Sequence, residues 1–246
     1  MELVRRFFDQ PKQSYFLFGP RGTGKSTWMR EVNRSALTLD LLDPETERVL
    51  RARPESLEER IDGATNRTII LDEVQKVPEL LPVVHRLIEQ KRGLFFVMSG
   101  SSARKLRRAG TDLLAGRALT MSFHPFMASE LGGVFDLPSA LRIGMLPVVL
   151  FAPDPELTLR SYVGLYLREE VQAEGLTRNL GDFSRFLETM SFSHGSVLNM
   201  TNVARDASVE RRTAAGYLGI LEDLMLGTTI PVFTRRAKRA VIAHPK

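Results

Sequence analysis

Short runs of apolar, strand-forming residues alternate with helical segments through the first half of the chain. The apolar runs cover residues 14–18, 36–41, 68–72, 93–99 and 117–121. Regular alternation of strands and helices favours a parallel sheet with helices on both faces, which binds ligands at the carboxyl ends of its strands. The sequence therefore predicts an α/β domain over residues 1–135.

The second half of the chain follows a different pattern. Residues 136–180 are interpreted as a helical linker or lid. Residues 181–246 then hold the amphipathic segments DFSRFLETMSF, TNVARDA and SVERRTAAGYLGILEDLML, with a turn at Ala207–Ser208 and a stripe of Tyr217, Leu221 and Leu224 on the last segment. TTIPVF and AVIAH resemble strands around the basic run RRAKR, so these residues predict a winged helix-turn-helix module.

A glycine-rich loop, GPRGTGKST, follows the first apolar run and matches the spacing G-x-x-x-x-G-K-[ST]. Such a loop turns its backbone N–H groups toward phosphate oxygens, at the positive N-terminal end of the next helix. A chance match in a surface turn is the alternative, but the order strand, loop, helix argues against it. The predicted nucleotide contacts are Gly19, Pro20, Arg21, Gly22, Thr23, Gly24, Lys25, Ser26 and Thr27.

Within this loop, Lys25 is expected to reach the β- and γ-phosphates, and the Ser26 hydroxyl to ligate Mg²⁺. The run TIILDEVQ, at residues 68–75, supplies two carboxylates at the end of a strand. Asp72 is predicted to hold Mg²⁺ through its water shell, and Glu73 to orient and deprotonate the attacking water. The alternative is that both acids only favour the start of the following helix.

Further polar residues follow the next two apolar runs. Ser99 and Ser101 are candidates for contact with the γ-phosphate or the attacking water, although serine is also a common turn residue. An arginine that stabilises the transition state is sought among Arg104, Arg107, Arg108 and Arg117. Arg117 is preferred because it opens the last strand beside the predicted site, and a solvated surface arginine is the equal alternative.

Composition narrows the class of protein. The 246 residues are 43% hydrophobic and 26% charged, as in an ordinary globular chain, and they include no cysteine, which excludes disulfides and zinc–thiolate sites. No apolar stretch is long enough to span a bilayer and no signal peptide is visible, so a cytoplasmic protein without a membrane partner is expected. The net charge of +5 favours an anionic partner.

Several motifs together resemble a group of bacterial and archaeal AAA-type ATPases. GPRGTGKST, ILDEVQKVPELLPVVHRLIE, SGSSARKLRR, LAGRAL and FHPFMASEL occur in that family's order, and YLREEV, NVARD and YLGILEDL are similar to its second part, a domain of unknown function. The resemblance implies an ATPase domain followed by a helical region and a winged helix. Members usually continue beyond a stretch like RRAKRAVIAHPK into a nuclease-like part, which is expected to be absent from a chain ending at Lys246.

The predicted function is Mg²⁺-dependent hydrolysis of ATP that drives a conformational switch. Alternatives are a nucleotide-gated DNA-binding or scaffold protein with little hydrolysis and, lower in rank, a small-molecule kinase. A homo-oligomer or a protein partner remains open. If the winged helix binds DNA, the expected contacts are Arg211, Arg212 and Thr213 in the major groove and Arg235, Arg236, Lys238 and Arg239 on phosphates.

Overall fold

A computed structural model describes residues 4–101, 106, 114–166 and 179–231. The chain divides into two compact units, Met1–Leu159 and Arg160–Lys246. Among the described residues, no helix combines the length and the apolar character needed to cross a membrane.

The strands that the structure describes belong to the first unit, and their bounds are β1 Tyr15–Phe18, β2 Leu37–Asp40, β3 Thr68–Asp72, β4 Phe95–Gly100 and β5 Leu119–Ser122. The helices that accompany them are α1 Lys25–Val32, α2 Pro44–Ala52, α3 Ser56–Asp62 and α4 Leu80–Glu89, with short 3-10 turns at Val74–Lys76 and Leu114–Gly116. After the sheet come α6 Ala128–Leu131, the 3-10 turn Gly132–Val134, α7 Leu137–Ile143, α8 Pro147–Leu150 and α9 Pro155–Ser161, which a π-helical turn continues over Tyr162–Tyr166.

The strands form one parallel sheet in the order β2-β3-β4-β1-β5. This result confirms the predicted α/β fold, and each strand lies within two residues of its predicted bounds. β4 lies between β1, which leads into the glycine loop, and β3, which ends at Asp72. Because all strands run in the same direction, the glycine loop and the ends of β3 and β4 meet at one edge of the sheet.

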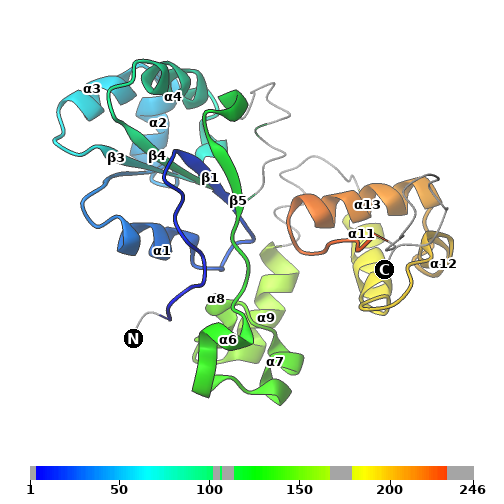
Figure 1. Ribbon diagram of the computed structural model, residues 1–246. Helices are drawn as coiled ribbons and strands as arrows, with labels where there is room; N and C mark the ends of the chain where they lie inside the picture. The colour runs from blue at the N-terminus through cyan, green and yellow to red at the C-terminus, as the bar shows by residue number, and fades with distance from the viewer. Residues whose placement is uncertain (1–3, 102–105, 107–113, 167–178, 232–246) are drawn as a thin grey trace, which may run out of the picture. The chain divides into compact units, whose positions relative to one another are not determined.

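Alternation along the strands divides the apolar residues between two faces. Tyr15 and Leu17 pack with Ile70 and Val97 against Met29 of α1. Phe16 and Phe18 point to the other face, where Figure 1 shows α3 and α4. Both faces are therefore covered, which explains why β1 is buried along its whole length.

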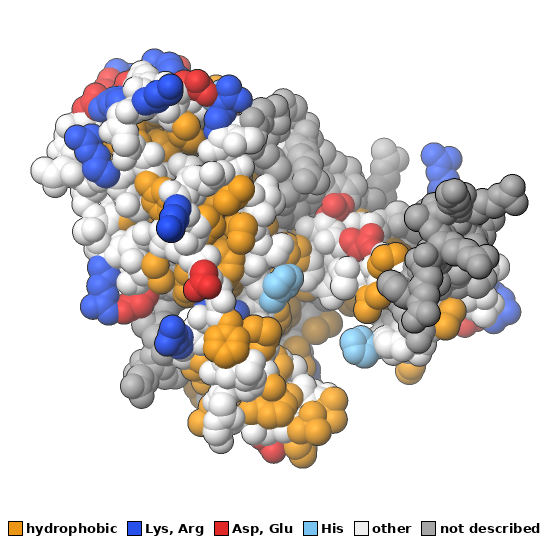
Figure 2. Space-filling view, in the orientation of Figure 1, with side chains coloured by type: hydrophobic (Ala, Val, Ile, Leu, Met, Phe, Trp, Pro, Cys, Tyr) orange, Lys and Arg blue, Asp and Glu red, His pale blue; other side chains and the backbone are white. Residues whose placement is uncertain are grey.

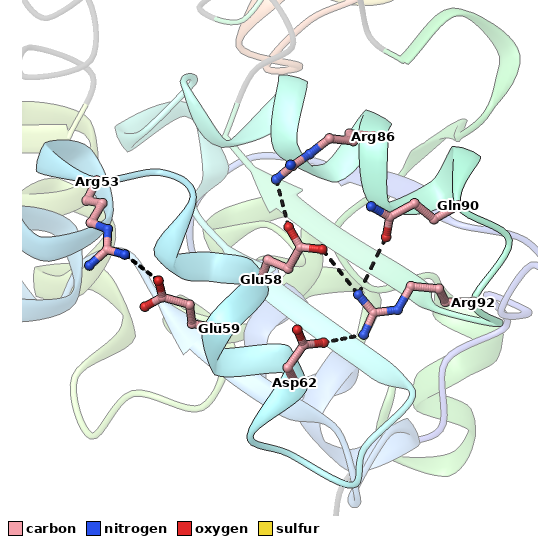
Figure 3. A network of polar contacts seen from close by, with 7 residues as sticks. All are labelled: Arg53, Glu58, Glu59, Asp62, Arg86, Gln90 and Arg92. Atoms are coloured by element: carbon pink, nitrogen blue, oxygen red, sulfur yellow. Dashed lines mark hydrogen bonds and ion pairs between the residues drawn. The ribbon is translucent and has the colours of Figure 1, made fainter.

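A network of charged side chains connects α3 to α4 and to the turn before β4 (Figure 3). Glu58 on α3 accepts from Arg86 at 2.8 Å and from Arg92 at 3.3 Å, and Arg92 also pairs with Asp62. Arg53 pairs with Glu59 beside this group. The arginines are about one-third or more exposed, so we expect each pair to add little stability on its own.

The helices after the sheet are shorter than the continuous pattern of residues 136–180 indicates. α7 is capped by Asp136, whose carboxylate accepts from the Ser139 N–H at 2.8 Å, and Gly144 ends it with a φ of 77°. Apolar side chains are exposed on and before α7, and Figure 2 shows hydrophobic atoms gathered there; they include Val134, Leu137 and Leu141. Residues 167–178 of the predicted linker lie outside the described residues.

The second unit is built from α11 Leu180–Ser191, α12 Met200–Asp206 and α13 Arg211–Asp223. Phe183 and Phe186 of α11 pack against Tyr217 of α13, with ring centroids 5.3 and 5.4 Å apart. The predicted stripe of Tyr217, Leu221 and Leu224 is buried in this core. Between α12 and α13, Ser208 turns the chain with a φ of 56°.

The predicted wing falls mostly outside the described residues. Its described part, residues 228–231, is not a strand, and the hydroxyl of Thr229 donates to Glu222 at 2.6 Å. Arg235, Arg236, Lys238 and Arg239 lie beyond residue 231. The helical part of the predicted module is therefore present in the described residues, and its β-ribbon stays a prediction.

Candidate nucleotide site

The glycine loop connects β1 to α1, as predicted. Gly22 and Gly24 have φ values of 77° and 86°, which side chains with a Cβ rarely adopt. Gly19 has a different reason to be glycine, because a Cβ there would lie 2.1 Å from the Phe123 carbonyl oxygen. The backbone therefore curls tightly before α1 begins at Lys25.

Lys25 is buried, and its ammonium group lies inside the curl of the loop. It donates to the carbonyl oxygens of Gly19 and Pro20 at 2.6 and 2.9 Å. The Thr23 hydroxyl donates to the Pro20 carbonyl at 2.8 Å, which closes the loop on the same side. A positive charge is thus held where loop N–H groups and the N-terminal end of α1 also favour an anion.

The two predicted metal ligands meet across the sheet edge. The Ser26 hydroxyl donates to Asp72 Oδ1 at 3.1 Å, and Ser99 donates to the same oxygen. Ser99 also accepts from the Glu73 N–H at 3.0 Å, so it connects the ends of β3 and β4. A hydroxyl and a carboxylate side by side are oxygen donors of the kind that Mg²⁺ takes together with substrate phosphates, so these residues fit that ion.

Arg30 and Asp40 also belong to this edge, although the sequence analysis did not single them out. Arg30 donates to Asp40 at 3.1 Å and to Asp72 at 3.4 Å. Asp40 ends β2 opposite Asp72 in the parallel register, and Arg30 lies one helical turn after Ser26. The spacing of four residues on one helix is the signal that could have identified Arg30.

Glu73 is buried directly after β3, with a left-handed backbone at a φ of 62°. Its carboxylate accepts from the amide of Gln75, which also lies 3.4 Å from the Ser101 hydroxyl. The Glu73 side chain does not cap the short 3-10 turn that follows, since it makes no capping hydrogen bond with that turn. The predicted base and both predicted serines are therefore brought together.

Arg117 lies elsewhere, and its expected place beside the loop needs correction. It precedes β5, whose first residue, Leu119, donates to the Ser14 carbonyl at the start of β1. Arg117 pairs with Glu89 at the end of α4. Because the sheet is parallel, this is the edge opposite to the glycine loop. Arg104, Arg107 and Arg108 lie outside the described residues.

Two contacts on the outer side of the loop were not predicted. The Val148 N–H of α8 donates to the Gly22 carbonyl at 3.1 Å, and a Cβ on Gly22 would lie 2.4 Å from Val148 Cγ1. Arg6, near the start of the chain, donates to the Thr23 carbonyl at 3.0 Å. Neither residue is part of the G-x-x-x-x-G-K-[ST] motif, so the motif gave no sign of them.

Comparison with known proteins agrees with this site. Residues 11–132 match a family described as an AAA domain, and residues 135–246 match a domain of unknown function (DUF8612). Over 229 residues the chain is 26% identical to an uncharacterized protein of Mycobacterium bovis and, to the same extent, to one of Mycobacterium tuberculosis. These alignments cover 91% of this chain and 51% of each relative, so the chain spans about half the length of the curated relatives it matches.

Among solved structures, the Thermotoga maritima RuvB Holliday junction branch migration motor is similar over 89% of this chain and 82% of its own. The two are 14% identical, with a TM-score of 0.39.

Proposed function

We propose that this chain, which belongs to the AAA domain family through residues 11–132 and carries a domain of unknown function after it, binds ATP with Mg²⁺ and hydrolyses it. One observation carries the proposal. The Ser26 hydroxyl and the Asp72 carboxylate lie 3.1 Å apart, next to a glycine loop that encloses a buried Lys25. Motifs separated by 46 residues in sequence thus converge on one place.

Binding of the triphosphate rests on groups that the loop already holds. Backbone N–H groups and the N-terminal end of α1 attract phosphate oxygens, and Lys25 exchanges its carbonyl partners for the β- and γ-phosphates. Ser26 and Asp72 would hold Mg²⁺, which neutralises phosphate charge in the transition state.

Hydrolysis requires a water molecule in line with the γ-phosphate and a group that accepts its proton. Glu73 is the only carboxylate directly next to Asp72 in the sequence, and we assign it this role. Ser99 is hydrogen-bonded to both the Asp72 carboxylate and the Glu73 N–H. These bonds hold the proposed metal ligand and the proposed base at a fixed distance from each other. Gln75 holds the Glu73 carboxylate and must release it when the base acts.

Two substitutions test the proposal in full-length protein. Lys25→Ala removes a charge-assisted contact worth about 1.5–3 kcal/mol, so the Kd for MgATP should rise about 10- to 100-fold. Glu73→Gln keeps shape and size but cannot accept the proton, so ATP should still bind while turnover falls by about a hundredfold or more. Titration calorimetry and phosphate release measure the two effects.

Lys12→Ala and Glu79→Gln are matched controls, because both side chains are exposed and belong to the same unit. Both controls should behave as wild type. Turnover of Glu73→Gln at the wild-type rate would remove Glu73 as the base. Turnover only in the presence of an added acceptor would favour the kinase alternative, and binding without turnover would favour a nucleotide-gated scaffold.

DNA is a second candidate partner, through the second unit. Arg211 and Arg212 are exposed at the start of α13, outside the buried stripe of that helix. A helix that follows a tight turn and presents arginines at its N-terminal end suits the major groove. Coupling of such contacts to ATP turnover would give the hydrolysis a mechanical output.

A further inference from the structure

Arg6 lies next to the glycine loop, and all three nitrogens of its guanidinium group donate hydrogen bonds. Nε donates to Glu130 at 3.0 Å, Nη1 donates to the Thr23 carbonyl at 3.0 Å, and Nη2 donates to the carbonyls of His124 and Pro125. The side chain of Arg6 is 8% exposed and that of Glu130 is 3% exposed. A charge buried to this degree is tolerated only when it is paired and hydrogen-bonded, as this one is.

The partner of Arg6 is itself firmly held. Glu130 accepts from the backbone N–H groups of Phe7 and Met127 at 2.8 and 2.9 Å. Burial acts to raise the pKa of Glu130, but these hydrogen bonds and the one from Arg6 outweigh it and leave the pKa below its usual range. The rings of Phe123 and Phe126 lie 4.2 and 4.6 Å from the guanidinium carbon. The guanidinium therefore has a fixed position relative to the sheet.

The hydrogen bond to Thr23 has a consequence inside the loop. In a trans peptide the C=O and the following N–H point in opposite directions. A Thr23 carbonyl held outward by Arg6 therefore directs the Gly24 N–H inward. The bond from the Val148 N–H to the Gly22 carbonyl acts in the same way on the Thr23 N–H.

We propose that Arg6 is a positioning residue of the nucleotide site, which presets the loop N–H groups for phosphate by fixing the Thr23 carbonyl. The inference rests on the proposed binding of ATP. Without the hydrogen bond from Arg6 to the Thr23 carbonyl, the peptide after Thr23 can rotate, because Gly24 accepts many backbone conformations. Part of the binding energy would then be used to order the loop.

Lysine is the informative replacement for Arg6. It keeps a positive charge opposite Glu130, so the buried carboxylate retains a partner and the chain is expected to fold. One ammonium group on a flexible stem cannot reproduce the planar fork that reaches Glu130, Thr23 and the His124 and Pro125 carbonyls together. Arg6→Lys therefore removes the hydrogen bond to the Thr23 carbonyl while it keeps the positive charge beside Glu130.

The experiment is titration calorimetry of full-length wild type, Arg6→Lys and Arg5→Lys with MgATP and with MgADP. Arg5 is the matched control, because it is the exposed neighbour of Arg6. Arg6→Lys should weaken both nucleotides about tenfold, with unchanged stoichiometry, and Arg5→Lys should match wild type. Titrations are run well below the melting temperature of each variant.

The stoichiometry distinguishes positioning from a merely structural role. Irreversibly misfolded chains lower the stoichiometry and leave the Kd of the remaining molecules unchanged, and reversible unfolding is negligible well below the melting temperature. A misplaced loop, in contrast, raises the Kd in every molecule. An unchanged Kd in Arg6→Lys overturns the inference and leaves the proposed function intact. Absence of MgATP binding in wild type overturns both.

Discussion

The Tyr15 hydroxyl lies in the aromatic cluster between the sheet and α1. Phe8, Phe95 and Trp28 belong to this cluster, and Tyr15 itself is fully buried. Within the described residues the hydroxyl has no hydrogen-bond partner, and burial raises the pKa of Tyr15 above its usual range. A buried polar group without a partner lowers stability. Burial of the Tyr15 ring therefore stabilises the fold, whereas burial of its hydroxyl destabilises it.

Tyr15→Phe should therefore stabilise the first unit. Removal of the unpaired oxygen should raise the free energy of unfolding by about 1 kcal/mol. Urea denaturation followed by the fluorescence of Trp28, the single tryptophan, reports on this unit directly. A lower stability in Tyr15→Phe would mean that the hydroxyl has a partner, such as a buried water molecule.

At the residue scale, the sequence identified the groups that belong to a known motif. Ser26, Asp72 and Ser99 lie together, because strand ends in a parallel sheet share an edge, and their roles toward a nucleotide stay predictions. Arg6 was not identified, since its contacts depend on how segments remote in sequence pack against it. Gln75 was not identified either, because the motif assigns no role to the second residue after Glu73. Arg117 was misplaced because it precedes the first residue of β5. The first residues of parallel strands lie at the edge of the sheet opposite to the glycine loop.

At the scale of elements, buried strands were predictable and helix breaks were less so. β1 is apolar on both faces, so its sequence is an unbroken apolar run that predicts a buried strand. The segment 136–180 has helical spacing, but Pro147 and Pro155 begin new helices and Gly144 ends α7. Proline at the first position of a helix explains these starts.

α13 is the element on which the proposed DNA binding should depend. Arg211→Ala with Arg212→Ala should weaken binding of duplex DNA and reduce its salt slope by about one for each phosphate that is no longer neutralised. Fluorescence anisotropy of a labelled duplex over a range of salt measures both quantities. Arg48→Ala with Arg51→Ala on α2 removes the same charge and is the control. Equal binding by both double variants would point to a protein partner for α13.

At the scale of the whole molecule, the position of Arg117 suggests assembly. It lies across the sheet from the nucleotide site of its own chain and is 40% exposed, paired with Glu89. If Arg117 stabilises the transition state, it must therefore act on the phosphates of a second copy. We therefore expect the ATPase rate per chain to rise with protein concentration.

A mixing experiment tests this arrangement. Lys25→Ala has a defective site but an intact Arg117, and Arg117→Ala has the reverse, so each should be slow alone. If Arg117 acts across chains, the mixture should recover part of the wild-type rate. Activity equal to the sum of the separate variants, at every concentration, would contradict an arginine supplied between chains.

The bond between Arg6 and the glycine loop has a practical consequence for recombinant production. The AAA family match begins at residue 11, so a truncation cloned to that boundary would remove Arg6 and Phe8. Glu130 would then lose its cation and the hydrogen bond from the Phe7 N–H, and Trp28 would lose the Phe8 ring that packs 4.9 Å from it. Expression plasmids for the isolated AAA domain should therefore encode a chain that starts before Val4 and carries any affinity tag on a flexible spacer.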